Sequence, residues 1–278
     1  MVKKYICAFA DRRLSPALKR FGKQAKQMGI YDGIFLYNEN NLDKSFREFF
    51  KDKLKLRRGF GYWVWKPQII LQTLEKLNDG DLLQYADAGC HLNPKGLKRL
   101  NDYFEIVNES ETGLLAFEMP DYTEKQWTKG DLFDYFGVRN NPDIYPAQIA
   151  ATVLFLRKSK KSVEVIQKWM QVFYDNFALA DDTPSLSPNF PEFIENRHDQ
   201  SIWSILVKLN GVTRLSHSEQ CEVDEKYPIW ALRDKREKFR ISHIPVLAKR
   251  ILKKAAKRIL TEALYNRLKE LNRKLKAR

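Results

Sequence analysis

The chain has 278 residues, of which 44% are hydrophobic and 30% charged, so it supplies a packed core and is neither a disulfide scaffold nor a globally disordered protein. Its net charge is +14, but residues 246–278 carry +10 of it and residues 1–245 only +4. Charge confined to one end excludes a basic groove running through the fold and favours a tail that meets an anionic surface, so no nucleic-acid partner is expected.

The chain opens with a strand, a helix and a second strand. Residues 5–10 and residues 32–37 are apolar enough for buried strands. Between them, Ser15 is a good N-cap, Pro16 suits the first helical turn, and residues 16–28 follow helical spacing. This order predicts a parallel strand pair with a right-handed crossover, the beginning of a nucleotide-binding α/β sheet.

The remaining elements continue this alternation. Apolar runs predict strands at residues 81–85, 113–119, 150–156 and 211–215. Helical spacing predicts helices at residues 68–77, 94–107 and 159–177, and one within residues 193–209. Residues 42–56 read as a polar helix or a pair of turns, and residues 120–146 as a long loop of the kind that is functional or mobile.

The three cysteines, Cys7, Cys90 and Cys221, are widely spaced and form no zinc-binding motif. An odd number without a disulfide framework is typical of a reducing compartment. The first residues hold too few apolar positions before Asp11 for a secretory signal, and no apolar run has the length of a membrane-spanning helix. We therefore expect a cytoplasmic protein.

Asp87 follows the third predicted strand, in a turn that contains Gly89. Open α/β sheets bind ligands at the carboxyl ends of their strands. The glycine permits a close backbone approach to a diphosphate or metal, and Mg²⁺ or Mn²⁺ accepts one or two carboxylates plus phosphate oxygens. The alternative is that Asp87 only caps the turn.

Residues 59–67 (GFGYWVWKP) are the most unusual stretch of the chain. Lys66 directly precedes a predicted helix, whose N-terminus favours an anion, so this lysine is a candidate for contacting a phosphate. The alternative for Trp63 and Trp65 is that they pack into the core.

A third cluster, Arg197-His198-Asp199-Gln200, lies at a predicted helix start between apolar residues. Hydrogen-bonding groups at the edge of an apolar body are typical of a sugar-binding or general-base site. The alternative for Asp199 is a helix cap. Among the isolated histidines, His243 is the candidate for a late metal ligand.

Together these segments resemble a family of small bacterial GT-A-type glycosyltransferases of lipopolysaccharide and capsule assembly. The likeness covers residues 3–220 and rests on three motifs in order: GYWVWKP at 61–67, DGD at 79–81 with YADAGC at 85–90, and ENRHDQS at 195–201. The resemblance implies a GT-A-like fold, a mixed and mainly parallel sheet flanked by helices. It also implies hexosyl transfer from a nucleotide diphospho-sugar, expected to be a UDP-sugar, to a glycan or lipid-linked acceptor.

The resemblance further implies roles for individual residues. Ala10, Asp11 and Arg12 would lie near the nucleotide, Lys66 near the diphosphate, Asp87 and Gly89 at a Mn²⁺ or Mg²⁺ ion, and Asp199 at the donor sugar or acceptor hydroxyl as the catalytic carboxylate. The family's Asp-x-Asp signature reads Tyr85-Ala86-Asp87 here. The ion would therefore need water, phosphate or a later ligand such as His243.

The residues expected to bind substrate are aromatic and polar: Trp65, Trp127, Lys129, Arg197, His198 and Gln200. Trp127 and Lys129 belong to residues 120–146, which we expect to be a lid that excludes water from the donor. The alternative is an ordinary surface insertion. An inverting enzyme needs a carboxylate base, for which Asp134, Asp143 and Glu195 are alternatives to Asp199, whereas a retaining enzyme needs none.

Residues 246–278 have the pattern of a basic amphipathic helix, with apolar residues at Leu247, Ile251, Ile259, Leu264, Leu268, Leu271 and Leu275. Such a helix binds anionic lipid. We therefore expect a catalytic domain over residues 1–245 and a membrane-associating helix over residues 246–278, which places the protein on the inner face of the cell membrane. The alternative is a helix packed on the body or on a partner chain.

Two rival functions remain open. A non-catalytic nucleic-acid-binding protein would use the basic tail, and the nearly balanced charge of residues 1–245 disfavours it. A nucleotide-sugar hydrolase or a nucleotidyltransferase would be expected to have a glycine-rich phosphate loop near the first strand. Residues 9–16 (FADRRLSP) contain none.

Overall fold

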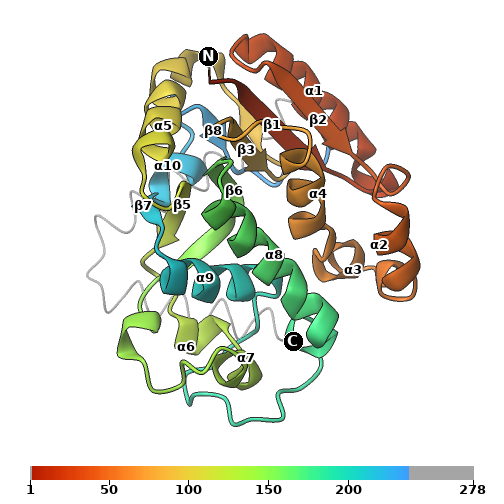
Figure 1. Ribbon diagram of the computed structural model, residues 1–278, viewed down its shortest axis with the longest axis vertical. Coiled ribbons are helices and arrows are strands. Elements are labelled where there is room, and N and C mark those ends of the chain that lie inside the picture. Colours follow the sequence, from red (N-terminus) through yellow and green to blue (C-terminus); the bar gives the residue numbers. More distant parts are fainter. Residues whose placement is uncertain (1, 238–278) are drawn as a thin grey trace, which may run out of the picture. The chain divides into compact units, whose positions relative to one another are not determined.

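The computed structural model describes residues 2–237 and has a six-stranded sheet at its centre, in the order β2-β1-β3-β6-β5-β7 (Figure 1). The strands are β1 (Lys4–Phe9), β2 (Gly33–Tyr37), β3 (Leu82–Ala86), β5 (Leu114–Met119), β6 (Gln148–Arg157) and β7 (Thr213–Ser216). β1 pairs parallel with β2 and β3, and β5 pairs parallel with β7, whereas β6 runs antiparallel to β3 and β5. The predicted class, a mixed and mainly parallel sheet flanked by helices, is confirmed.

Helices connect the strands, and a short second sheet pairs β4 (His91–Leu92) with β8 (Ile229–Trp230). The helices are α1 (Ser15–Met28), α2 (Lys44–Phe49), α3 (Gly59–Tyr62), α4 (Trp65–Leu74), α5 (Leu97–Glu109), α6 (Glu124–Trp127), α7 (Gly130–Tyr135), α8 (Lys160–Asp175), α9 (Asp199–Asn210) and α10 (Ser218–Cys221). Among the described residues, none of these helices combines the length and apolarity that crossing a bilayer requires.

Local sequence explains where α1 begins and ends. Asp11 caps the short turn before the helix by accepting hydrogen bonds from the backbone N–H groups of Arg13 and Leu14. Pro16 lies in the first turn, where its missing N–H has no helical partner to lose. Gly29 ends the helix at a φ of 66°, a left-handed conformation that suits glycine. The predicted helix at residues 16–28 is therefore confirmed.

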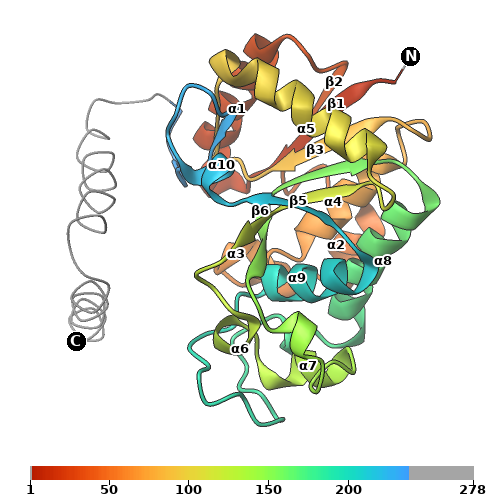
Figure 2. The same ribbon diagram turned by 90° about the vertical axis from the view of Figure 1, so that its left-hand side faces the viewer.

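Alternating side chains divide the core into two layers. Cys7 and Phe9 of β1 belong to one buried cluster, and Ile6 and Ala8 to the other. Figure 2 shows α4, α8 and α9 on one side of the sheet and α1 and α5 on the other. Each large apolar side chain buried in these layers contributes roughly 1.5–3 kcal/mol to stability before entropy is counted.

Three of the strands bring candidate residues to one edge of the sheet. The parallel strands β1 and β3 end there, directly before Ala10 and Asp87, and the oppositely directed β6 begins there with Gln148. The backbone N–H of Asp87 donates to the carbonyl oxygen of Thr152 in β6 at 2.9 Å. This edge therefore holds Asp87, the residue that the sequence singled out after the third strand.

Some predicted boundaries were wrong. Residues 120–146 are not a loop, because they contain α6, α7 and a 3-10 turn at Pro142–Ile144. These helices are too short to show a helical period, although a capping box at Thr123 and Gln126 marks the start of α6. By contrast, the helix expected within residues 193–209 begins at Asp199, inside the cluster where the sequence placed its start.

Two sequence predictions fall outside the described residues. They are the metal ligand His243 and the basic helix at 246–278. Membrane association through that helix, and with it the division of the chain into residues 1–245 and 246–278, stays a prediction.

Candidate functional site

A buried lysine, Lys66, links two carboxylates at the edge of the sheet. Its ammonium nitrogen Nζ lies 2.6 Å from Asp199 Oδ2 and 3.4 Å from Asp87 Oδ1. Nζ also donates to the carbonyl oxygen of Ala151 in β6 at 3.0 Å. One of these contacts is a hydrogen bond and the other two are ion pairs, so acceptors of Asp199, Asp87 and Ala151 enclose the Lys66 ammonium. The fold thus joins three charged residues that lie far apart in the sequence.

Asp87 is the member of this trio that reaches solvent. Its side chain is 34% exposed, against 3% for Lys66 and 7% for Asp199. The hydroxyl of Tyr85 donates to Asp87 Oδ1 at 2.5 Å, so this oxygen serves both Tyr85 and Lys66. Oδ2 accepts no hydrogen bond from residues 2–237, which leaves it for a ligand.

Asp199 lies behind Lys66, at the first position of α9. Burial raises the pKa of the Asp199 carboxyl to about 6, and the ammonium of Lys66 opposes that rise. Burial alone would lower the pKa of Lys66, but the charges of Asp199 and Asp87 outweigh it, and the lysine pKa is raised. The pair is therefore ionic at neutral pH, and Asp199 becomes neutral as the pH falls through about 6.

His198 is held in an unfavourable backbone conformation directly before Asp199. Its φ of 57° and ψ of −124° are rare for a residue with a side chain, and such strain costs on the order of 1–3 kcal/mol. Nδ1 lies 2.7 Å from the carbonyl oxygen of Ala180, so Nδ1 carries the proton and donates. Burial lowers the pKa of His198, and Nε2 is buried without a hydrogen-bond partner among residues 2–237. Oδ1 of Asp182 lies 3.9 Å from this nitrogen.

The guanidinium of Arg197 stacks on aromatic rings. It lies 4.0 Å from the ring centroid of Trp127 and 5.5 Å from that of Tyr122. Its Nε is buried and makes no hydrogen bond, and no ion pair involves Arg197 within the part of the chain that the structure describes. The structure therefore brings Arg197 and Trp127, two of the expected substrate-binding residues, into contact.

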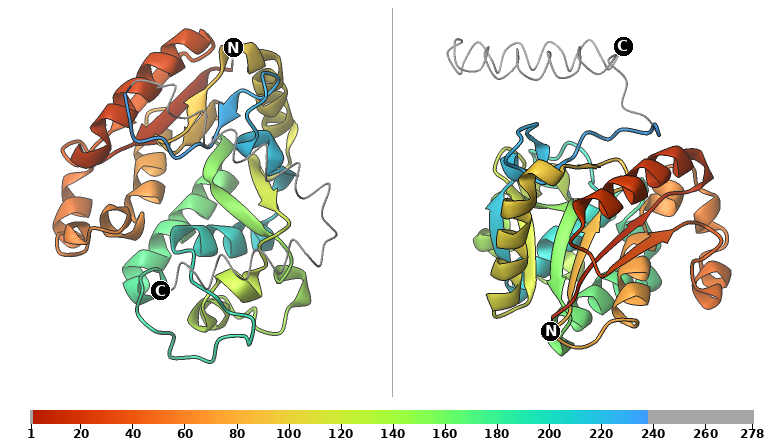
Figure 3. Two further views of the ribbon diagram at one scale, coloured as in Figure 1. Left: turned by 180° about the vertical axis from the view of Figure 1, so that it is seen from behind. Right: turned by 90° about the horizontal axis from the view of Figure 1, so that it is seen from above.

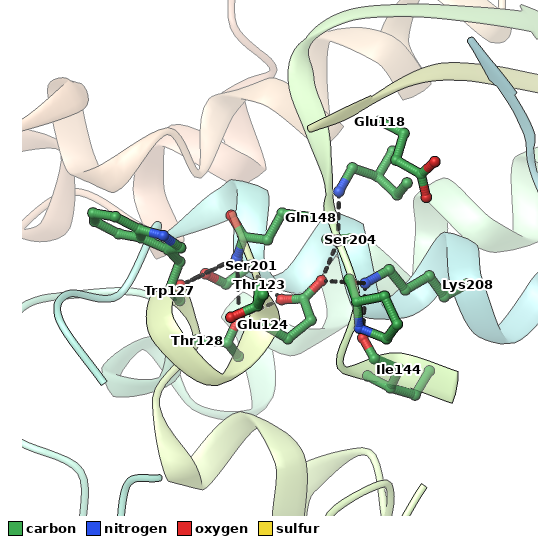
Figure 4. Close-up of polar contacts among 12 residues, drawn as sticks. Glu118, Thr123, Glu124, Trp127, Thr128, Ile144, Gln148, Ser201, Ser204 and Lys208 are labelled. Carbon is green, nitrogen blue, oxygen red and sulfur yellow. Dashed lines mark hydrogen bonds and ion pairs between the residues drawn. The ribbon is translucent and has the colours of Figure 1, made fainter. Parts of the chain in front are cut away.

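The sequence analysis missed a buried carboxylate, Glu124, in α6. Oε1 of Glu124 accepts from Lys208 Nζ at 2.9 Å and from the hydroxyl of Ser204, while Oε2 accepts from the hydroxyl of Thr128 at 2.5 Å and from Gln148 Nε2 at 3.0 Å (Figure 4). Both members of the ion pair are buried, with 0% of Glu124 and 2% of the Lys208 side chain exposed. In the sequence, this glutamate lies in the segment that was expected to be a loop, where nothing indicated its burial.

The Glu124 cluster reaches the candidate site through Gln200. Nε2 of Gln200 donates to Oε1 of Gln148 at 2.9 Å, and Gln148 in turn donates to Glu124. Lys208 Nζ also donates to the carbonyl oxygens of Ile144 and Pro146. Because both ends of residues 120–146 are tied to α9 in this way, the structure favours a fixed part of the fold over a lid.

Two expected substrate-binding residues have packing partners instead. Trp65 is 6% exposed, stacks on Phe9 with the ring centroids 4.1 Å apart, and donates its indole N–H to the carbonyl oxygen of Gly59. Lys129 is 3% exposed, and its ammonium donates to the carbonyl oxygens of Ala178, Asp181 and Thr183. With three hydrogens and three acceptors, Lys129 has no donor left for a substrate. These contacts favour structural roles.

The residues after β1 lie at the same edge but offer little to a ligand. Ala10 and Asp11 are buried, and the Asp11 carboxylate accepts from the guanidinium of Arg13. Arg12 is exposed, and its backbone N–H donates to Glu39. At Gly89, an added Cβ would lie 3.0 Å from the Cα of Arg233, so the chain's own backbone makes the close approach there.

Two pockets lie away from this cluster. One, of about 330 Å³, lies between α7, α8 and α9 and includes Tyr135 and Leu206 in its lining. The other, of about 510 Å³, borders α7, and its charged residues Asp134 and Arg139 pair with each other. Neither pocket brings together unpaired polar groups as the Asp87 edge does. We therefore choose the candidate site by its charged and polar residues and not by the volume of a pocket.

No family model matches the chain, and no curated protein matches it. Similar solved structures include the galactosyltransferase LgtC in complex with donor and acceptor sugar analogs. The match has 14% identity and a TM-score of 0.43, and it covers 78% of this chain and 74% of that chain. Mouse xyloside xylosyltransferase 1 has 8% identity over 82% of this chain and 97% of that chain, with a TM-score of 0.44. The 4-diphosphocytidyl-2C-methyl-D-erythritol synthase of Anaerococcus prevotii has 11% identity over 89% of this chain and 96% of that chain, with a TM-score of 0.38. All three TM-scores are below 0.5, so these likenesses carry no argument about the site.

Proposed function

We propose that this chain is a glycosyltransferase that moves a sugar from a nucleotide diphospho-sugar, expected to be a UDP-sugar, to a glycan or lipid-linked acceptor. One observation carries the proposal: Asp87 reaches solvent at the carboxyl edge of the parallel strands and is held there by Lys66 and Tyr85. Ligands of open α/β sheets bind at this edge. Residues 61–67, 85–90 and 195–201, which carry the family resemblance, all contribute to the cluster.

The bacterial surface role has a narrower basis. Synthesis of lipopolysaccharide or capsule follows from the resemblance alone, and a lipid-linked acceptor follows from the basic segment at 246–278. Both belong to the proposal and need tests of their own.

The available oxygen of Asp87 suits a divalent ion. Within residues 2–237, no three His, Cys, Asp or Glu side chains are grouped so that they could hold a metal. Asp87 would then be one protein ligand of Mg²⁺ or Mn²⁺, with water and phosphate oxygens as the others. When bound, such an ion neutralises charge that develops on the leaving diphosphate.

Removal of divalent ions tests this part of the proposal. We expect transfer to stop in EDTA and to return when Mn²⁺ or Mg²⁺ is added in excess, measured as release of the nucleoside diphosphate. Full activity in EDTA would remove the ion from the account, whereas donor binding would remain to be measured separately.

Lys66 is too enclosed to contact the diphosphate as the sequence suggested. Its ammonium is enclosed by Asp199, Asp87 and the carbonyl oxygen of Ala151, and its side chain is 3% exposed. Asp199 is similarly enclosed, and a base for an acceptor hydroxyl needs access to that hydroxyl. We therefore propose that Asp199 is a positioning residue: it fixes Lys66, and Lys66 fixes Asp87.

This arrangement predicts that the transfer rate falls as the pH drops through about 6. The pKa of Asp199 is raised to about 6, so the carboxyl is ionised above that pH and neutral below it, and only the ionised form attracts Lys66. Asp199→Asn is expected to lower the rate about 10- to 100-fold and to abolish this dependence. The matched control is Glu111→Gln, an exposed carboxylate paired with Lys161, which should keep it. If Asp199→Asn shows the same fall in rate at low pH, another group is responsible for the pH dependence.

Arg197 is the group we propose for contacting the substrate. His198 is 4% exposed and its Nε2 is buried, so it is no more accessible to a sugar than Lys66. Arg197 presents guanidinium hydrogens beside the Trp127 ring, an apolar surface of the kind that sugar rings contact.

The experiment that tests the function is a screen of nucleotide sugars for binding and slow hydrolysis, with Asp87→Ala as the control. We expect one donor class to bind saturably and to release a nucleoside diphosphate. Release of pyrophosphate would instead indicate a nucleotidyltransferase. If the unsubstituted protein binds none of the donors, the proposed function fails.

A further inference from the structure

Arg233 is an exposed cation beside the turn that holds Asp87. It follows β8, and its Cα lies 3.0 Å from the position that a Cβ on Gly89 would take. The donor that we propose carries two phosphates, and the Lys66 side chain is only 3% exposed, too buried to contact them. The residues around Arg233 therefore decide whether it supplies the missing positive charge.

A buried neighbour, Asp234, fixes the position of Arg233. The backbone N–H of Asp234 donates to the carbonyl oxygen of Gly89 at 2.9 Å. Its carboxylate lies 3.0 Å from His91 Nε2 and 3.4 Å from Arg20 Nη1. Arg20, in α1, also donates to the carbonyl oxygens of Ala88 and Cys90. Figure 3 shows the segment after β8, in blue, passing beside α1.

Arg233 itself has a backbone conformation that needs such support. Its φ of 55° lies in the left-handed region, which is uncommon for an arginine and costs on the order of 1 kcal/mol. Its side chain is exposed and makes no ion pair or hydrogen bond with residues 2–237. The guanidinium is thus held next to the Asp87 turn without serving the packing of the described residues.

A second guanidinium lies near the first. Burial lowers the pKa of Arg197, Glu195 and Tyr122 oppose that effect, and the positive charges of Arg233 and Arg58 add to it. Two cations that interact across a site repel each other, and a bound anion offsets that repulsion. Arginine forms paired hydrogen bonds with phosphate oxygens, so a diphosphate suits this arrangement.

We propose that Arg233 binds the diphosphate of the donor nucleotide. This inference rests on the proposed function and deepens it, because it transfers the phosphate contact from Lys66 to a residue that the sequence did not single out. The inference also assigns a role to residues 231–237, which place Arg233 against the Asp87 turn.

The test is titration calorimetry of the full chain with UDP and with uridine, in buffer that contains Mg²⁺. Arg233→Gln is expected to weaken UDP binding about ten-fold or more, the worth of one charge-assisted contact, and to leave uridine binding unchanged. Lys235→Gln removes the same charge from an exposed side chain two residues away and should leave both affinities unchanged. Equal melting temperatures would show that all three proteins are folded.

Three results would overturn the inference. Unchanged UDP affinity in Arg233→Gln would remove Arg233 and leave the proposed function standing. An equal loss in Lys235→Gln would mean that only general charge attraction was measured. If the unsubstituted protein binds neither UDP, nor uridine, nor any other nucleotide, both the proposed function and the inference fail.

Discussion

Replacing Asp87 with asparagine is expected to lower the rate of sugar transfer at least about 100-fold while leaving the protein folded. The side chain is 34% exposed, so the fold loses little buried area. The amide keeps an oxygen for the hydrogen bond from Tyr85 but loses the charge that would hold a divalent ion and attract Lys66. The measurement is the turnover number with saturating donor.

Asp79→Asn is the matched control for this substitution. Asp79 lies between α4 and β3, and its side chain is 87% exposed. Its Oδ1 lies 3.7 Å from Lys158 Nζ. Because such surface pairs contribute about 0–1 kcal/mol, this variant should transfer sugar at the normal rate. A normal rate in Asp87→Asn would contradict the assignment of the site to this edge.

Replacing Lys208 with methionine is expected to destabilise the protein by about 3–5 kcal/mol, because it leaves the Glu124 carboxylate buried without its cation. Glu124 is fully buried, so water does not replace the lost charge. Three hydrogen bonds to this carboxylate remain, from Ser204, Thr128 and Gln148, and they stabilise the charge only in part. The free energy of unfolding in urea measures the effect.

A second substitution separates charge from packing. Adding Glu124→Gln to Lys208→Met removes the isolated charge, so the double variant should recover part of the lost stability. The control is Lys161→Met, which breaks a surface pair with Glu111 and should cost less than about 1 kcal/mol. If Lys208→Met costs no more than this control, the buried pair does not anchor residues 120–146.

The sequence predicted the strands and the long helices, because these features are local. Pro16 in the first turn and Gly29 at the end mark α1 without reference to the rest of the fold, but Ser15, expected as the N-cap, is the first residue of the helix. A local signal also identifies Asp87, which the sequence places at the end of a buried strand. Such signals act within one or two helical turns.

Partners could not be predicted where they come from distant segments. Lys66 was expected at the diphosphate and Lys129 at the substrate. Two carboxylates and a carbonyl oxygen enclose Lys66, and carbonyl oxygens from residues 178–183 accept from Lys129. Glu124 gave no sign of burial, since the packing of α6 against α9 creates it. Arg233 belongs to no motif, and only the fold brings it to Gly89.

The most direct measurement is an experimental structure of the full chain bound to UDP and Mg²⁺. The account predicts that the diphosphate lies at the carboxyl edge of β1 and β3, within reach of Asp87 through the ion and of the Arg233 guanidinium. A nucleotide bound at another surface, with Asp87 facing only solvent, would contradict it.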